Sequence, residues 1–137
     1  MTDQEILDHL KPLLVEVLGV SPESIQQHSV LVADLGAESI DLLDLSFRIE
    51  EHFQVTLEAN EIEREATRRL PGGTYEKDGF LTAEALAEIR QAVPELDPTR
   101  IVPGLRKADL PSLLTVAFFV KLIARKLAAK PEGAAHV

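Results

Sequence analysis

The chain has 137 residues, of which 45% are hydrophobic, so it can bury a core, and wholesale disorder is excluded. It contains no cysteine, which rules out disulfides and a thiol nucleophile and suits a reducing cytoplasm. The net charge is −9, with −12 on residues 1–66 and +3 on residues 67–137, so the acidic first half repels nucleic acid and attracts basic protein surfaces.

Apolar residues at helical spacing predict a first helix over residues 3–18, ended by Gly19. Pro12 lies inside this segment and removes one backbone hydrogen bond, so we expect a kink, with the second half starting near Pro12. A long connection follows over residues 20–38. Within it, Ser21-Pro22-Glu23 predicts a single helical turn, because proline favours the first turn of a helix.

A second helix is predicted over residues 39–53, with acids on its polar side. We expect its apolar, core-facing side to consist of Ile40, Leu43, Phe47, Ile49 and Phe53. A third, shorter helix is predicted in residues 57–70, beginning around Glu58.

The second half of the chain predicts two further helices separated by irregular structure. Residues 71–80 have the composition of a loop, and Thr82 is a suitable cap for a helix over residues 81–93. Residues 94–111 contain four prolines and predict an ordered loop. Asp109 is the expected cap of the last helix, which runs to about Ala129, and residues 131–137 should fray. The predicted fold is all-α, in one domain spanning residues 1–137.

Targeting and membrane signals are absent from the sequence as it stands. The start, MTDQEILDHL, lacks the basic residues and apolar block of a secretory signal. The longest apolar stretch, residues 113–124, is shorter than the roughly 20 residues that cross a bilayer. We therefore expect a cytoplasmic protein without a membrane span.

Ser39, at the start of the second predicted helix, allows several interpretations. Serine is a favourable N-cap, which is a purely structural role. A hydrolase nucleophile would require Gly-x-Ser-x-Gly and a positioned base, but Ala37 and Asp41 occupy the glycine positions. None of the four histidines has a spacing that places it beside Ser39.

Residues 33–57, ADLGAESIDLLDLSFRIEEHFQVTL, resemble the acyl carrier proteins, whose signature is Asp-x-Gly-x-Asp-Ser-Leu followed by an acidic helix. Glu38 replaces the usual aspartate and Ile40 the usual leucine. The positions that match the family pattern are Asp34, Leu35, Gly36, Ser39, Asp41, Asp44, Glu50, Glu51 and Phe53. The preceding helix and loop are also similar, so the resemblance covers about two thirds of the chain together with the last helix.

The resemblance implies a non-enzymatic carrier whose Ser39 is esterified to 4′-phosphopantetheine by a phosphopantetheinyl transferase. The arm would carry acyl groups as thioesters to ketosynthases, acyltransferases or other enzymes of fatty-acid, lipid or polyketide synthesis, and the carrier would be a monomer. Such enzymes present basic patches to the second helix. The residues expected to contact them are Glu38, Ile40, Asp41, Leu42, Asp44, Glu50 and Glu51. Two alternatives are a peptidyl or aminoacyl carrier and a protein-interaction module without cofactor.

Carriers of this family are usually shorter, so residues 67–109 resemble an insertion between the third and last helices. It is either a structural addition packed on the bundle or an element that reshapes an acyl pocket lined by Phe118, Phe119 and Ile123. Residues 74–86 are also similar to an EF-hand calcium loop, but Ala85 stands where that loop requires a glutamate. No metal site is expected.

Overall fold

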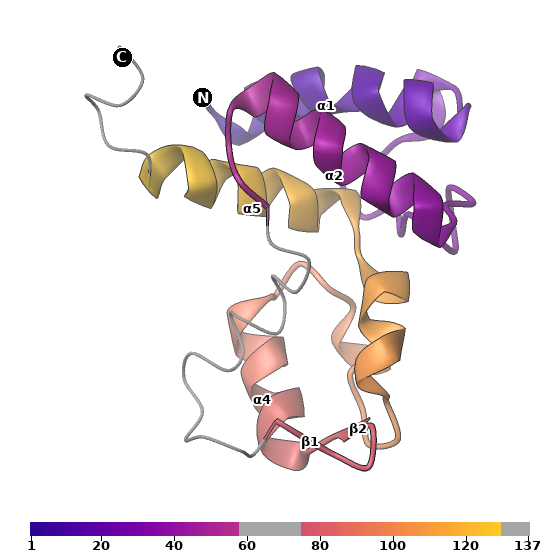
Figure 1. Ribbon diagram of the computed structural model, residues 1–137, viewed down its shortest axis with the longest axis vertical. Helices are drawn as coiled ribbons and strands as arrows, with labels where there is room; N and C mark the ends of the chain where they lie inside the picture. The colour runs from indigo at the N-terminus through magenta and orange to yellow at the C-terminus, as the bar shows by residue number, and fades with distance from the viewer. Residues whose placement is uncertain (58–74, 130–137) are drawn as a thin grey trace.

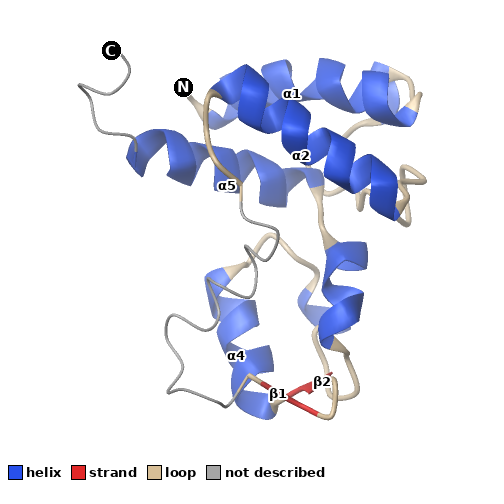
Figure 2. Ribbon diagram, viewed as in Figure 1, coloured by secondary structure: helices blue, strands red, loops and turns tan. Residues whose placement is uncertain are grey.

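The computed structural model describes residues 1–57 and 75–129, and helices dominate this part of the chain (Figure 2). The all-α prediction is confirmed; the predicted third helix and the tail at residues 131–137 lie outside the described residues. The elements are α1 (Asp3–Leu18), η1 (Pro22–Ser24), α2 (Ser39–Phe53), β1 (Glu76–Lys77), β2 (Phe80–Leu81), α4 (Ala83–Ala92), η2 (Pro98–Arg100), η3 (Lys107–Leu113) and α5 (Val116–Ala129). No helix in these ranges is long and apolar enough to cross a membrane.

The helices α1, α2 and α5 form a bundle in which α1 packs against both of the others (Figure 1). Its core contains Ile6, Leu10, Leu14, Ile49 and Ile123, all with fully buried side chains. Thr2 caps α1 by accepting a hydrogen bond from the backbone N–H of Glu5, and Gly19 ends the helix with a φ of 68°.

α1 is one continuous helix from Asp3 to Leu18 with Pro12 inside it, so no second helix starts at Pro12, and the predicted kink stays a prediction. Pro12 and Asp8, the residue whose carbonyl loses its hydrogen bond, are both on the exposed side of α1. Water can satisfy that carbonyl, which lowers the cost of the proline.

The core-facing side of α2 differs from the predicted one. Leu45, Ile49 and Phe53, spaced four residues apart, are buried on the side of α2 that packs in the bundle with α1. Ile40, Leu43 and Phe47 are instead 70%, 56% and 59% exposed. The helix has two apolar stripes on nearly opposite sides, roughly 150° apart, and either could cover a core, so periodicity alone could not select between them.

Below the bundle lies a second region, called here the inserted lobe and comprising the described residues 75–113 (Figure 1). β1 and β2 form a short antiparallel hairpin, and β2 also bonds to the chain near η3, with Leu81 N–H donating to the Leu105 carbonyl at 3.0 Å. The predicted cap of α4 is confirmed, because Thr82 Oγ1 accepts from the Ala85 N–H at 3.2 Å. Arg90 donates to the Ile101 carbonyl and holds α4 against the proline-rich segment.

The hairpin also removes the basis for a calcium loop. Asp78 and Gly79 form its turn, both with positive φ, as a tight two-residue turn requires. Ala85, at the position where the loop would need a bidentate glutamate, is fully buried in α4.

Bundle and inserted lobe meet at the residues just before α5. The loop between η1 and α2 forms an isolated β-bridge there, Val30 with Thr115. Leu31 N–H donates to the Leu114 carbonyl at 3.0 Å, and Val116 N–H donates to the Ser29 carbonyl at 3.0 Å. These bonds fix the approach to α2 against the exit from the inserted lobe.

The predicted cap of the last helix is wrong. Asp109 belongs to η3, where its Oδ2 accepts from the Arg106 N–H at 3.0 Å, and α5 begins only at Val116. Thr115, which is 3% exposed, caps α5 instead: its Oγ1 accepts from the Phe118 N–H at 3.0 Å. The same hydroxyl donates to the Glu95 carbonyl of the inserted lobe at 3.2 Å.

Candidate functional site at the start of α2

The loop that leads into α2 is held by buried side chains and by backbone hydrogen bonds. Its buried residues are Leu31, Leu35 and Ala37, so the apolar side chains pin it to the core. Ala37 N–H donates to the Leu31 carbonyl at 2.9 Å, and Gly36 turns the chain with a φ of 74°, a conformation that favours glycine. The loop therefore delivers Ser39 to a defined position at the surface.

Ser39 is the first residue of α2 rather than its cap, and the N-cap is Glu38. Asp41 Oδ2 accepts from the Glu38 N–H at 2.9 Å and supports this helix start. Among the described residues the Ser39 hydroxyl has no hydrogen-bond partner, and the residue is exposed. The first-turn N–H groups and the helix dipole favour an anionic group such as a phosphodiester there.

The helix α2 brings no histidine close to Ser39. His52 lies thirteen residues further along the same helix, which at a rise of about 1.5 Å per residue is roughly 20 Å away. Its Nε2 is instead 3.0 Å from His9 Nδ1 on α1. With neither glycine of the nucleophile motif present, the geometry gives no support to a hydrolase.

An apolar stripe runs from the site along the exposed side of α2. We call Ile40, Leu43 and Phe47 the apolar stripe; Ile40 directly follows Ser39. Of the two apolar contacts predicted from the sequence, Ile40 is exposed, whereas Leu42 is half-buried. Leu43 and Phe47 were missed as surface residues because the helical pattern placed them in the core. Three large apolar side chains in register on a surface mark an interaction site.

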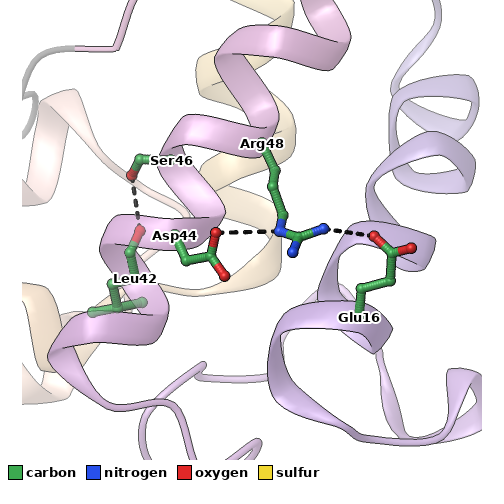
Figure 3. A network of polar contacts seen from close by, with 5 residues as sticks. All are labelled: Glu16, Leu42, Asp44, Ser46 and Arg48. Carbon is green, nitrogen blue, oxygen red and sulfur yellow. Dashed lines mark hydrogen bonds and ion pairs between the residues drawn. The ribbon is translucent and has the colours of Figure 1, made fainter.

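The predicted acidic residues are all at least partly accessible, but they differ in their partners. Asp44 Oδ1 accepts from Arg48 Nε at 3.2 Å, while Arg48 also pairs with Glu16 of α1 at 2.7 Å (Figure 3). Glu50 Oε2 accepts from the Leu57 N–H at 2.9 Å. These bonds order the carboxylates beside the stripe while leaving their second oxygens available, so α2 keeps an acidic surface.

A helical bundle with an accessible serine at a helix start, bordered by apolar and acidic side chains, has the features of a carrier-type protein. The family model for the phosphopantetheine attachment site matches residues 8–67, which include Ser39. The acyl carrier protein of Wolinella succinogenes is 40% identical over 62 residues, covering 45% of this chain and 82% of that protein. Those of Campylobacter fetus and Chlamydia muridarum are 36% and 39% identical, covering 43% and 42% of this chain and 77% and 74% of those proteins.

The chain therefore belongs to the acyl carrier protein family. Members of this family are carriers rather than enzymes, and their prosthetic group is 4′-phosphopantetheine. The predicted family, cofactor and carrier role are thus confirmed. The match ends at residue 67, so the inserted lobe lies beyond it.

Proposed function

We propose that Ser39 is the residue to which 4′-phosphopantetheine is attached, through a phosphodiester made by a phosphopantetheinyl transferase. The observation that carries this proposal is the exposed, unpartnered Ser39 hydroxyl on the first turn of α2, within the described chain. The first-turn N–H groups of α2 would stabilise the phosphate. Once bound, the arm supplies a thiol that holds acyl groups as thioesters.

The apolar stripe and its acidic border form the proposed docking face for the transferase and for acyl-handling enzymes. A partner with an apolar pocket for Ile40, Leu43 and Phe47 and a basic rim fits this face. The acidic residues assigned to the border are Glu38, Asp41, Asp44, Glu50 and Glu51. Exposed rim charges mainly raise the association rate and select partners, which suits a shuttle that must also release them.

The finer assignments are also proposals. Delivery to fatty-acid, lipid or polyketide synthesis is favoured over a peptidyl or aminoacyl carrier, because Glu38 precedes the serine and α2 is strongly acidic. We further propose one monomeric domain acting in the cytoplasm. The buried residues of bundle and inserted lobe form one continuous cluster, which supports a single domain, and the chain has no cysteine.

An acyl pocket involving Phe118, Phe119 and Ile123 stays a prediction. All three side chains are buried in α5, with exposed fractions of 3%, 4% and 0%, so they are core residues first. Such a pocket would have to open by moving side chains that now fill the core. The contact of the two phenylalanine rings, edge to face with centroids 5.3 Å apart, already accounts for their placement.

Incubation with coenzyme A and a broad-specificity phosphopantetheinyl transferase, followed by intact-mass measurement, tests the attachment residue. The wild type should gain the mass of one phosphopantetheine, and Ser39→Ala should gain none. Ser46→Ala is the matched control: Ser46 lies two turns further along α2, and its hydroxyl donates to the Leu42 carbonyl at 2.9 Å. An unmodified wild type, or a modified Ser39→Ala variant, would contradict the proposal.

A further inference from the structure

The inserted lobe is attached to the loop that presents Ser39. The chain leaves η3 at Leu113, and the next residue, Leu114, accepts a backbone hydrogen bond from Leu31 at 3.0 Å. Leu31 in turn accepts from Ala37, two residues before Ser39, at 2.9 Å. Two backbone hydrogen bonds therefore connect the end of η3 to the Ser39 loop.

Thr115 makes this junction rigid. Its buried hydroxyl caps α5 and donates to the carbonyl of Glu95, which follows α4 in the sequence, so a single side chain bonds to both regions. The inserted lobe consequently has a fixed position relative to Ser39 instead of hanging from a free linker. Figure 1 shows η3 on the side of the bundle at which α2 begins, with the hairpin and most of α4 further away.

These connections bound the distance from Ser39 to the lobe. Two residues of extended chain span at most about 7 Å, and one N–H···O=C bond joins two residues whose Cα atoms are at most about 7 Å apart. The Cα atoms of Ser39 and Leu114 are thus no more than about 21 Å apart. A protein partner typically covers about 800 Å², a disc about 32 Å across, so one partner bound over Ser39 can also cover the junction.

We propose that η3 forms the second half of the docking face, so that a phosphopantetheinyl transferase bound at Ser39 contacts both α2 and the exposed side of η3. This inference rests on the proposed function, because it takes Ser39 as the modified residue. The exposed residues of η3 are Ala108, Asp109 and Pro111. η3 lies on the side of the bundle at which α2 begins, and Asp109 is accompanied there by Arg106 and Lys107, so this half of the face carries both signs of charge.

The inserted lobe then works as a specificity element. An enzyme whose surface fits only the helical bundle would clash with η3 when it binds at the serine. An enzyme with room for η3 would instead gain contact area. The kind of partner that fits best is therefore a transferase whose rim is basic opposite α2 and carries both signs of charge opposite η3.

Amide chemical shifts of the isotope-labelled Ser39→Ala chain, titrated with the transferase and coenzyme A, test the contact directly. This variant binds without being modified. Amides in the first turn of α2 and in η3 should shift, while those of Glu76 and Lys77 in the hairpin should not. Shifts in α2 without shifts in η3 would overturn the inference and leave the proposed function standing. The absence of shifts in both regions would contradict the docking proposal as well.

A pair of bulky substitutions gives the kinetic test. Pro111→Trp adds bulk to the exposed side of η3, and Ala87→Trp adds the same bulk to the exposed side of α4. Pro111→Trp should raise the KM of the transferase for the carrier at least about fivefold with kcat little changed, because binding is obstructed before chemistry. Ala87→Trp should stay within about twofold of wild type. Equal KM values for both variants would overturn the inference, provided that circular dichroism shows both folded.

Discussion

The helices α2 and α4 are both amphipathic, but they differ in the side that faces away from the core. α4 buries Ala85, Leu86 and Ile89 and exposes mostly small, polar or charged residues, as expected for a helix that only covers a core. α2 buries one apolar stripe and exposes a second one, Ile40, Leu43 and Phe47. The inserted lobe thus shows what a purely structural helix of this protein looks like, and the departure of α2 from it is the basis for the proposed docking face.

The largest expected effect separates the two sides of α2. Ile49→Ala removes a fully buried side chain and should lower the free energy of unfolding by about 2–5 kcal/mol, measured by urea denaturation. Phe47→Ala removes a larger side chain, but one that is 59% exposed, and should cost less than about 1 kcal/mol. Equal losses would mean that the apolar stripe is part of the core.

A substitution at the junction between bundle and inserted lobe should give the next largest loss of stability. Thr115→Val keeps the shape of the side chain but leaves the Glu95 carbonyl and the Phe118 N–H without their partner, which should cost about 1–3 kcal/mol. Thr115→Ser retains the hydroxyl and should recover most of this loss. Tyr75, the single tyrosine of the chain, lies in the inserted lobe, so its fluorescence reports on that region. In the wild type its transition should coincide with that of the helical circular dichroism signal; separate transitions would contradict the single domain.

Two exposed phenylalanines provide a comparison of docking. Phe47→Ala should raise the KM of the transferase by roughly three- to tenfold, because an apolar side chain would be lost from the docking face. Phe80→Ala, in the hairpin of the inserted lobe, is the control: Phe80 is 40% exposed and its ring contacts the Arg106 guanidinium at 5.1 Å. The KM of the transferase for Phe80→Ala should be close to that for wild type. A rise comparable to that of Phe47→Ala would contradict the proposed position of the docking face.

The smallest expected effect is a pH dependence in the inserted lobe. Hydrogen bonds from the Thr99 hydroxyl and N–H lower the pKa of Asp97. A lowered pKa in the folded state stabilises the fold above the ordinary aspartate pKa of about 3.9, and this contribution is lost as the pH falls through the lowered value. Thr99→Val should therefore melt slightly below wild type at neutral pH, and the difference should shrink below about pH 4. A difference in melting temperature that persists unchanged at pH 2 would contradict this assignment.

Local sequence signals predicted much of this molecule. Helix boundaries followed from capping and apolar spacing, as at Thr82 and Gly19, because these preferences act within a few residues of the chain. The exposed position of Ser39 and the acidic character of α2 followed in the same way. The resemblance to a known family supplied the carrier role and the cofactor, which no periodicity could reveal.

Tertiary contacts decided the rest. Which apolar stripe of α2 faces the core depends on how α1 packs against it, and the two stripes are equivalent within the helix itself. α5 begins at Val116 and not near Asp109, as was predicted. The reason is that Thr115 bonds to Glu95, twenty residues earlier, and also pairs with Val30. The chain determines its helices through neighbours in sequence; their exposed faces, and the position of the inserted lobe beside Ser39, depend on partners that only the folded structure brings together.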